Sequence, residues 1–353
     1  MPGPEGATPP GDGPSPVALS TVDGPILVTG GGGFVGGAVV RQLVARGDRV
    51  RSLQRSDAPE LRALGVDVVR ADLGNRDETL AAAAGCVAIV HIAAKAGVWG
   101  SEASYVRANV DGTRHVLQAC AVHGIRRLVY TSTPSVIHGG GDIEGIDETA
   151  PLATHFQTAY PRTKAIAERL VLAANGPLLG TVALRPHLIW GPNDPQLTAR
   201  ILQRARAGRL RLVGGGLKRI DSVYIDNAAA AHLLALDRVA PGAGCAGKAY
   251  FITQGEPMPQ RDLVNGILAA AGLPPCERSV SPRVAYVLGA TLELVWHLLR
   301  REQEPPMTRF VASQLATAHW YDITAARRDL GYVAEVSVAE GLRRLAVHLR
   351  ESP

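Results

Sequence analysis

Short apolar segments alternate with helix-like segments along the first half of the chain. The apolar segments are ILVT at 26–29, VRSL at 50–53, VDVVRA at 66–71, VAIVHIAA at 87–94, RRLVYTS at 126–132 and TVALRP at 181–186. Helical periodicity predicts helices between them, over 34–46, 77–84, 104–123 and 160–174. Almost continuously apolar strands that alternate with helices are typical of a parallel sheet covered on both faces. The predicted fold class is α/β, a Rossmann-type doubly wound parallel sheet.

The alternation loosens after Pro186, where Gly and Pro become frequent and helices are predicted over 225–238 and 260–271. We therefore expect three parts. Residues 1–23, rich in Pro and Gly and without the basic start and apolar run of a signal peptide, are predicted to be a disordered extension. Residues 24–190 are predicted to form the Rossmann domain. Residues 191–353 are predicted to form mainly a smaller, discontinuous lobe, with some segments returning to the Rossmann domain.

One apolar stretch, VAYVLGATLELVWHLL at 284–299, stands out in this second part. It is shorter than the roughly 20 residues that a membrane-spanning helix needs, and it contains Glu293 and His297. We interpret it as a helix of the core or one that faces a partner enzyme. The alternative is a helix that lies against a membrane surface.

Composition narrows the class of ligand. The chain has 353 residues, 46% of them hydrophobic, and a formal charge of +5. Its Lys and Arg residues are spread out rather than clustered as in a nucleic-acid-binding arm, so we expect anionic small ligands and no nucleic acid. The four cysteines stand far apart at Cys86, Cys120, Cys245 and Cys276, which predicts neither a zinc site nor a disulfide framework and favours a cytoplasmic protein.

A glycine-rich segment, TGGGGFVGG, follows the first predicted strand and opens the first predicted helix. Gly30, Gly33 and Gly36 are spaced G-x-x-G-x-x-G. Glycine permits the tight turn and the close approach of the backbone to a pyrophosphate at the helix N-terminus. A glycine run alone could be a plain loop, but its place between strand and helix favours a dinucleotide site.

The end of the second strand bears on the choice of cofactor. An acid that binds the ribose 2′-hydroxyl of NAD is expected there, whereas the sequence has Gln54 and Arg55. A guanidinium suits a 2′-phosphate, so NADPH is the predicted cofactor. The alternative for Arg55 is an ordinary solvated charge. Asp72 follows the third strand and is expected to accept from the adenine amino group, or else to cap the next helix. Ala93 and Ala94 leave space beside the fourth strand.

A tyrosine and a lysine carry the predicted chemistry. The segment YPRTK sets Tyr160 and Lys164 four residues apart, on one face of a predicted helix. An ammonium next to a phenol favours the phenolate and so lowers the tyrosine pKa, and such a tyrosine can pass a proton to a carbonyl oxygen while hydride reaches the carbon. This spacing also occurs by chance on helix surfaces. The hydroxyl-rich strand end YTSTPS, with Ser132 and Thr133, lies where ligands of doubly wound sheets bind.

Taken in order, TGGGGFVG, ADL, HIAA, NVDGT, YTSTPSV, YPRTK, LRPHLIWGP and VYIDNAAAAH resemble the extended short-chain dehydrogenases/reductases, in the branch of the 3β-hydroxysteroid and sterol-4-carboxylate dehydrogenases. The resemblance implies that Tyr160 is the general acid, that Lys164 assists it and contacts the nicotinamide ribose, and that Asn109 supports the proton relay. Thr133 occupies the position of the family's catalytic serine, with Ser132 one residue earlier. The cofactor site implied in this way comprises Gly30, Gly33, Phe34, Val35, Gly36, Arg55, Asp72, Leu73, Ala93, Ala94, Lys164 and Pro186, although Pro186 is also a plausible strand terminator.

Further segments resemble the reductases that act on 2-alkyl-3-oxo acids in bacterial long-chain olefin biosynthesis, among them AAKAGVWGS, CAGKAYFITQGEP and TAHWYDI. This implies reduction of a fatty β-keto acid, a substrate that needs one cation and extended apolar walls. The predicted substrate residues are Lys95, Trp99, Ser132, His187 and Trp190, with Arg219 and Tyr224 as further candidates for cation and wall. The alternative for each of them is an ordinary core or surface residue without contact to a substrate. The alternatives are a hydroxysteroid or sterol-4-carboxylate dehydrogenase and a non-catalytic NADPH sensor. A homo-oligomer is expected.

Overall fold

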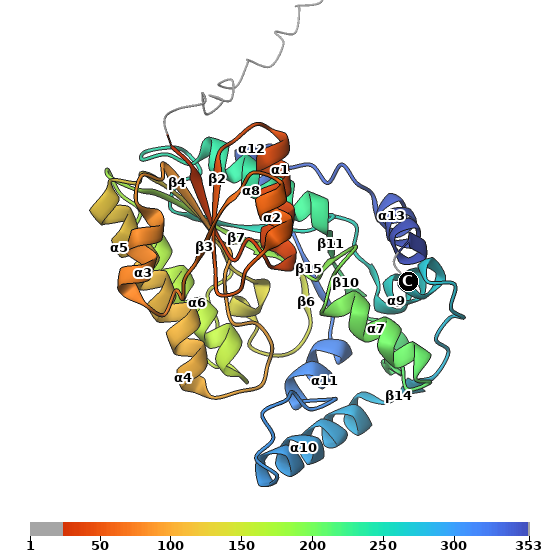
Figure 1. Cartoon of the computed structure of the whole chain (residues 1–353). Coiled ribbons are helices and arrows are strands. Elements are labelled where there is room, and N and C mark those ends of the chain that lie inside the picture. The colour runs from red at the N-terminus through yellow and green to blue at the C-terminus, as the bar shows by residue number, and fades with distance from the viewer. Residues whose placement is uncertain (1–23, 352–353) are drawn as a thin grey trace, which may run out of the picture.

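A computed structural model describes residues 24–351, so the extension predicted over 1–23 lies outside the described residues. The main layer is a sheet of seven parallel strands in the order β3-β2-β1-β4-β5-β7-β12 (Figure 1). Its strands are β1 (Ile26–Thr29), β2 (Val50–Gln54), β3 (Asp67–Arg70), β4 (Ala88–His91), β5 (Arg127–Thr131), β7 (Gly180–Pro186) and β12 (Lys248–Ile252). The predicted Rossmann-type α/β fold is confirmed, and β12 brings a segment of the second half into this sheet.

Helices cover both faces of the sheet. Each strand contributes apolar side chains to both faces, because successive side chains point to opposite sides. In β1, Ile26 and Val28 pack in one apolar cluster, together with α1 (Phe34–Ala45) and α8 (Ile225–Arg238). Leu27 packs in a second cluster on the other face. That face is covered by α3 (Arg76–Ala83), α5 (Gly112–His123) and α6 (Ala159–Ala173). The short helix α2 (Pro59–Ala63) precedes β3.

The helix predicted over 104–123 is present without a break, but its middle part is a π-helix, which was not predicted. The chain forms α4 (Glu102–Tyr105), then a π-helix over Val106–Asp111, and then α5. A π-helix inserts a wider turn and is often found at functional sites. Hydrophobic periodicity cannot reveal it, since the apolar spacing on either side remains helical.

The second lobe is built from short strands and helices. Its four-stranded sheet has the order β13-β10-β15-β6, with β6 (Ile143–Ile146), β10 (Arg219–Ile220), β13 (Met258–Pro259) and β15 (His319–Tyr321). Two parallel pairs join β8 (Ile189–Trp190) to β11 (Val223–Tyr224) and β9 (Leu212–Val213) to β14 (Ser279–Val280). The helices are α7 (Leu197–Arg206), α9 (Gln260–Ala270), α10 (Pro282–Leu298), α11 (Arg309–Ala316), α12 (Thr324–Leu330) and α13 (Val338–Glu351), and 3₁₀ turns occur at Pro134–Ile137 and Gly214–Gly216.

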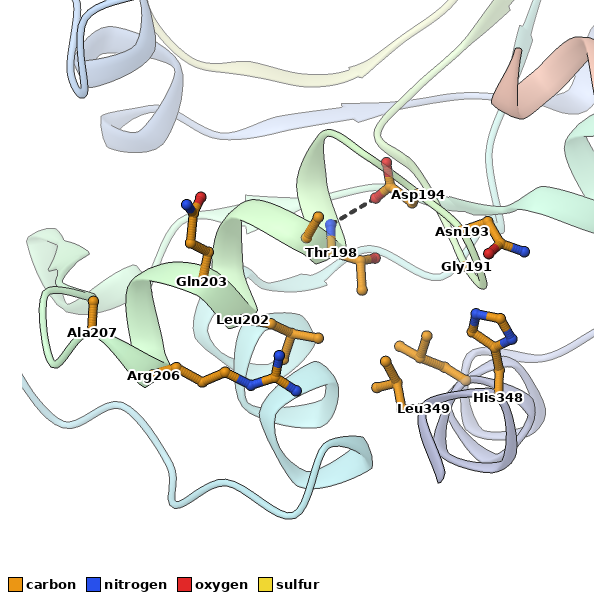
Figure 2. A pocket seen from close by; sticks show the side chains of 12 residues that line it. Gly191, Asn193, Asp194, Thr198, Leu202, Gln203, Arg206, Ala207, His348 and Leu349 are labelled. Carbon is orange, nitrogen blue, oxygen red and sulfur yellow. Dashed lines mark hydrogen bonds between the residues drawn. The ribbon is translucent and has the colours of Figure 1, made fainter. Parts of the chain in front are cut away.

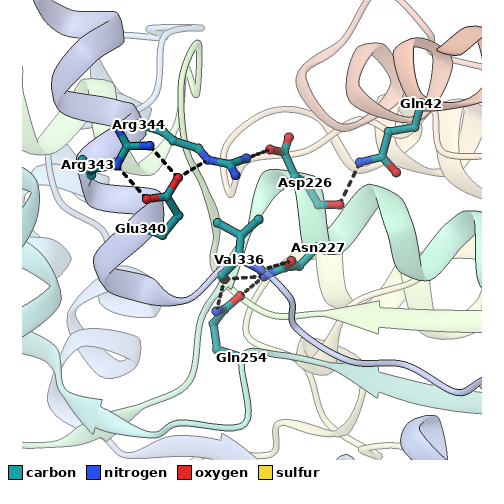
Figure 3. A network of polar contacts seen from close by, with 8 residues as sticks. All are labelled: Gln42, Asp226, Asn227, Gln254, Val336, Glu340, Arg343 and Arg344. Carbon is teal, nitrogen blue, oxygen red and sulfur yellow. Dashed lines mark hydrogen bonds and ion pairs between the residues drawn. The ribbon is translucent and has the colours of Figure 1, made fainter.

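Buried amides tie the C-terminal segment to α8 (Figure 3). The Asn227 side chain donates to Val336 O at 2.8 Å and to Gln254 Oε1 at 2.7 Å, and it accepts from Val336 N at 3.0 Å. Nearby, Arg344 of α13 pairs with Asp226 at 3.0 Å. The backbone of Val336 is therefore held to α8 just before α13 begins.

The apolar stretch at 284–299 forms most of α10, but it is not part of the core. Only Ala285 and Gly289 of this helix are buried. Large side chains such as Val287 and Leu298 are 63% and 74% exposed. α10 is therefore not a helix of this chain's own core. The remaining expectations for its apolar side chains are a partner enzyme and a membrane surface.

Candidate active site

The glycine loop between β1 and α1 has the geometry of a dinucleotide site. Gly30 has φ +74°, a conformation that side chains other than glycine rarely adopt. A Cβ added to Gly36 would lie 2.0 Å from Gly30 O, so the helix packs directly against the turn. Gly33 precedes α1, and no side chain caps its first turn. The free N–H groups of that turn suit a pyrophosphate, and Phe34 and Val35 are the first residues of the helix.

The end of β2 offers no carboxylate to a ribose. Gln54 lies against Gly32 of the glycine loop, and its amide accepts from Ser52 Oγ and donates to Ser56 O. Arg55 is the next residue and is exposed. Its place beside the loop fits the predicted contact with a 2′-phosphate.

Asp72 lies after β3 in a compact turn. Its carboxylate accepts from Gly74 N at 2.8 Å and pairs with Arg107 at 2.7 Å. The residue that caps α3 is Asn75, so Asp72 is not the helix cap considered as an alternative. Leu73 is buried beside it. Asp72 as the adenine partner stays a prediction. Ala93 backs directly onto Gly30, whereas Ala94 is exposed.

Tyr160 and Lys164 lie on α6, as predicted, and converge on the end of β5. The Tyr160 hydroxyl lies next to the side chain of Thr133, two residues beyond the end of β5. Lys164 is buried, its Nζ donates to Thr131 O at 2.5 Å, and it lies 4.1 Å from the centroid of the Tyr130 ring. Tyr160 and Lys164 of α6 therefore meet the distant Thr133 at the carboxyl edge of the sheet, where doubly wound folds bind ligands.

The pKa of Tyr160 differs from the sequence-based expectation. Burial raises it to about 12, and the neighbouring Thr133 hydroxyl offsets part of this rise. Lys164, whose ammonium points to Thr131 O, does not lower it. Burial in turn lowers the pKa of Lys164 to about 7, with Glu168 opposing the shift. Tyr160 therefore keeps its proton at neutral pH, which suits a group that donates a proton to a ketone oxygen during reduction.

Asn109 lies in the π-helix and holds two elements in place. Its Oδ1 accepts from Lys95 N at 2.7 Å, and its Nδ2 donates to Lys95 O at 3.2 Å and to Thr163 Oγ1 at 3.0 Å. The side chain is almost fully buried. Asn109 thus joins the loop after β4 to the helix that carries Tyr160, which is a positioning role.

A cavity of about 980 Å³ opens beside these residues. We call it the Lys95 cavity. Lys95 and Trp99 line it on the Rossmann side, next to Thr158 and Ala159, which lead directly into Tyr160. The Lys95 ammonium donates to Ser104 Oγ at 2.6 Å and lies 4.8 Å from the centroid of the Tyr105 ring. The opposite wall comes from α10 and α11. The cavity thus combines a cation with large aromatic side chains.

The other predicted substrate residues lie away from this cavity. Ser132 is buried at the strand end. Trp190 is fully buried, donates to Ser222 Oγ at 3.1 Å and packs against Tyr224, so both aromatic rings belong to the core rather than to a substrate wall. Arg219 lies in β10 and donates to Pro257 O at 2.8 Å.

His187 belongs to a buried histidine cluster that the sequence analysis missed. Its ring centroid lies 6.0 Å from that of His319, which lies 4.8 Å from that of His138. Burial lowers the pKa of His187 and of His319 to about 3 in each case, so these rings are neutral at physiological pH. The three residues come from distant segments and share no spacing, so no sequence signal brings them together. The neighbouring Leu188 has φ +43°, another feature without a sequence signal.

A second cavity of about 540 Å³ lies between α7 and α13 (Figure 2). Leu202, Leu345 and Leu349 form its apolar wall, and His348 and Arg206 stand at its edges. Neither cavity is lined by Tyr160, Lys164, Thr133 or Asn109 themselves. The Lys95 cavity is lined by Thr158 and Ala159, the two residues before Tyr160, so it is the candidate substrate site.

Within residues 24–351, no group of three or more His, Cys, Asp or Glu side chains is placed to hold a metal ion. The same part of the chain contains no helix with the length and apolarity to cross a bilayer.

A Rossmann sheet, a glycine loop that fits a dinucleotide, and Tyr160 and Lys164 on one helix at the carboxyl edge of the sheet define an NAD(P)-dependent oxidoreductase. The family model described as "3-beta hydroxysteroid dehydrogenase/isomerase family" matches residues 27–282, and the chain belongs to this family.

Comparisons with individual proteins agree with this family and class of enzyme. The chain is 56% identical over 322 residues to a 2-alkyl-3-oxoalkanoate reductase of Stenotrophomonas maltophilia, a match that covers 91% of the chain and 98% of the relative. It is 48% identical to the protein of that name in Shewanella oneidensis, over 92% of the chain and 86% of the relative. Among solved structures, a UDP-glucose 4-epimerase of Thermus thermophilus in complex with NAD is similar with a TM-score of 0.72 and 25% identity, over 93% of this chain and 99% of that one.

Proposed function

We propose that the chain reduces the 3-keto group of 2-alkyl-3-oxoalkanoates to the 3-hydroxy group with NADPH, as a cytoplasmic step in long-chain olefin biosynthesis. The observation that carries this proposal is the 56% identity to a reductase of that name over 98% of its length. The described cysteines are all free, which supports a reducing compartment.

The site supports the same reaction. A bound NADPH would supply the hydride that the ketone carbon needs, and the carbonyl oxygen needs a proton from the protein. Tyr160 is the donor of that proton, since it is protonated at neutral pH and lies at the carboxyl edge of the sheet beside Thr133. Thr133 is placed to hold the carbonyl oxygen, and Asn109 keeps the neighbouring loop in position. Lys95 offers a cation to the substrate carboxylate inside a cavity with aromatic walls for the alkyl chains.

The direct test is NADPH oxidation by the purified chain with a 2-alkyl-3-oxo acid, with a ketosteroid and without substrate. We expect turnover with the keto acid only. Faster reduction of the ketosteroid would replace the proposal by a hydroxysteroid activity, which the family description also names. Tight NADPH binding with no turnover on any substrate would favour a sensor.

Cofactor choice has its own test. If Arg55 pairs with a 2′-phosphate, Arg55→Ala should weaken NADPH binding by about 1.5–3 kcal/mol, the size of a charge-assisted bond, and leave NADH binding nearly unchanged. Arg49→Ala is the matched control, because Arg49 is exposed just before the opposite end of β2. Equal losses for the two cofactors, or a wild-type preference for NADH, would contradict the assignment of NADPH.

A further inference from the structure

The helix α10 presents a continuous apolar stripe to solvent. Eight of the thirteen large hydrophobic side chains that are exposed in the described chain lie within 284–299. Seven of these eight recur on one side of the helix at spacings of three and four residues: Val284, Val287, Leu288, Leu294, Val295, Leu298 and Leu299. We call this set the α10 stripe. Concentration of exposed apolar side chains in one stripe marks an interaction surface.

The opposite side of α10 faces the Lys95 cavity. Tyr286, Glu293 and His297 line the cavity, and their helical spacing sets them away from the α10 stripe. The His297 ring packs on Trp99, with centroids 4.7 Å apart. Glu293 is turned inward and bonded to Arg309 of α11. One helix therefore separates the candidate substrate cavity from an exposed apolar surface.

The charges around the α10 stripe are positive. Arg283 is exposed at its N-terminal end, and Arg300 and Arg301 are exposed at its C-terminal end. The single acid of α10, Glu293, points to the cavity side, and Glu302 beyond the helix is the nearest exposed acid in sequence. The indole of Trp296 lies partly buried beside the stripe. An apolar stripe with arginines at both ends is typical of helices that lie in the headgroup region of anionic bilayers.

We propose that the α10 stripe docks on an anionic lipid bilayer, with α10 parallel to the membrane plane. The charges favour a bilayer over a second copy of this chain. Because both ends of α10 carry arginines, a parallel or antiparallel contact between two copies would bring cations together, whereas anionic headgroups neutralise both ends. The helix does not have the length to span the membrane, and a helix lying on it need not.

Docking would place the Lys95 cavity next to the bilayer. Acids with two long alkyl chains partition into lipid, so a cavity separated from the membrane by one helix can take its substrate from there. This consequence rests on the proposed function, whereas docking itself does not.

The test is cosedimentation of the full chain, without substrate, with vesicles of phosphatidylglycerol and phosphatidylcholine or of phosphatidylcholine alone. We expect binding to the anionic vesicles that weakens with salt. In Leu294→Gln/Leu298→Gln the partition coefficient should fall by about 10-fold or more, because two apolar side chains leave the interface. In Arg283→Gln it should fall severalfold on anionic vesicles only. Leu178→Gln is the matched control, since Leu178 is 76% exposed and lies outside α10.

Three outcomes would overturn the proposal. The first is that the wild type binds no vesicles, and the second is that Leu178→Gln and the double variant lose vesicle binding equally. The third is that the double variant breaks up an oligomer in analytical ultracentrifugation, which would assign the α10 stripe to a second copy. Unchanged thermal unfolding and unchanged turnover of a short, water-soluble keto acid would show that the double variant is folded. A chain that binds vesicles but reduces no keto acid would refute the proposed function and leave the docking intact.

Discussion

Lys164 is a predicted catalytic residue whose burial costs the fold stability. It is buried, and burial lowers its pKa to about 7 from 10.5. Between these two values the unfolded chain holds a proton that the folded protein has released. The free energy of unfolding therefore rises with pH through this window, and the penalty is complete below about pH 7.

Lys164→Met removes this penalty. Relative to the wild type, the variant should be most stabilised at about pH 6 and lose that advantage by about pH 10, because a neutral amine is no longer costly to bury. Chemical denaturation at the two pH values measures the difference. Lys248→Met is the control, since Lys248 is half exposed. If Lys164→Met and the wild type differ in free energy of unfolding by the same amount at both pH values, the pKa of Lys164 is not depressed.

Lys95 is the residue that we propose to bind the substrate carboxylate. Its ammonium lines the cavity and is bonded to a neutral hydroxyl, Ser104 Oγ, so its charge remains available to a carboxylate. An ion pair also keeps a β-keto acid ionised, and this opposes loss of carbon dioxide. Lys95→Met should lower kcat/KM for the keto acid about 10-fold or more and affect the corresponding plain ketone far less. Equal effects on the two substrates would reject Lys95 as the partner of the carboxylate.

At the scale of elements, the π-helix positions Asn109 between the loop after β4 and α6. Asn109→Ala leaves Lys95 N–H without its acceptor and should lower the free energy of unfolding by about 1–3 kcal/mol. It should also raise KM for the keto acid, because Lys95 loses its fixed position. Asn265→Ala is the control: Asn265 holds one backbone N–H, that of Cys276, far from the site. If both variants lose stability and both leave KM unchanged, Asn109 has only a structural role.

Local sequence patterns predicted part of these elements. The glycine spacing and the strand-helix alternation depend on neighbouring residues, so both could be read from the chain. The π-helix could not, because the apolar spacing around it remains helical. The exposure of α10 could not either, since periodicity shows that a helix has an apolar face but not what covers it. The cluster of His138, His187 and His319 depends on packing between distant segments.

At the scale of the whole molecule, buried polar contacts hold the C-terminal segment in place (Figure 3). Asn227 is 2% exposed and makes three hydrogen bonds, whereas the Arg344–Asp226 pair is exposed. Asn227→Ala should therefore lower the free energy of unfolding by about 1–3 kcal/mol and Arg344→Ala by less than about 1 kcal/mol. Urea denaturation compares them. A larger loss in Arg344→Ala would mean that surface charge, not buried amides, holds α13.

The chain also combines segments in a way that its linear order conceals. β12 comes from the second half and joins the main sheet, while β6 comes from the first half and joins the small one. β12 is a segment of the kind expected to return to the Rossmann domain from beyond residue 190, whereas the entry of β6 into the small sheet was not predicted.

The most direct test of the account is turnover of a 2-alkyl-3-oxo acid by Tyr160→Phe under saturating NADPH. This variant loses the proton donor but keeps the ring, so the rate should fall by about 100-fold or more while the Kd for NADPH stays near that of the wild type. Tyr332→Phe, which removes a buried hydroxyl bonded to Thr253 O, should keep most of the rate. Near-normal turnover by Tyr160→Phe would contradict the central claim that Tyr160 supplies the proton.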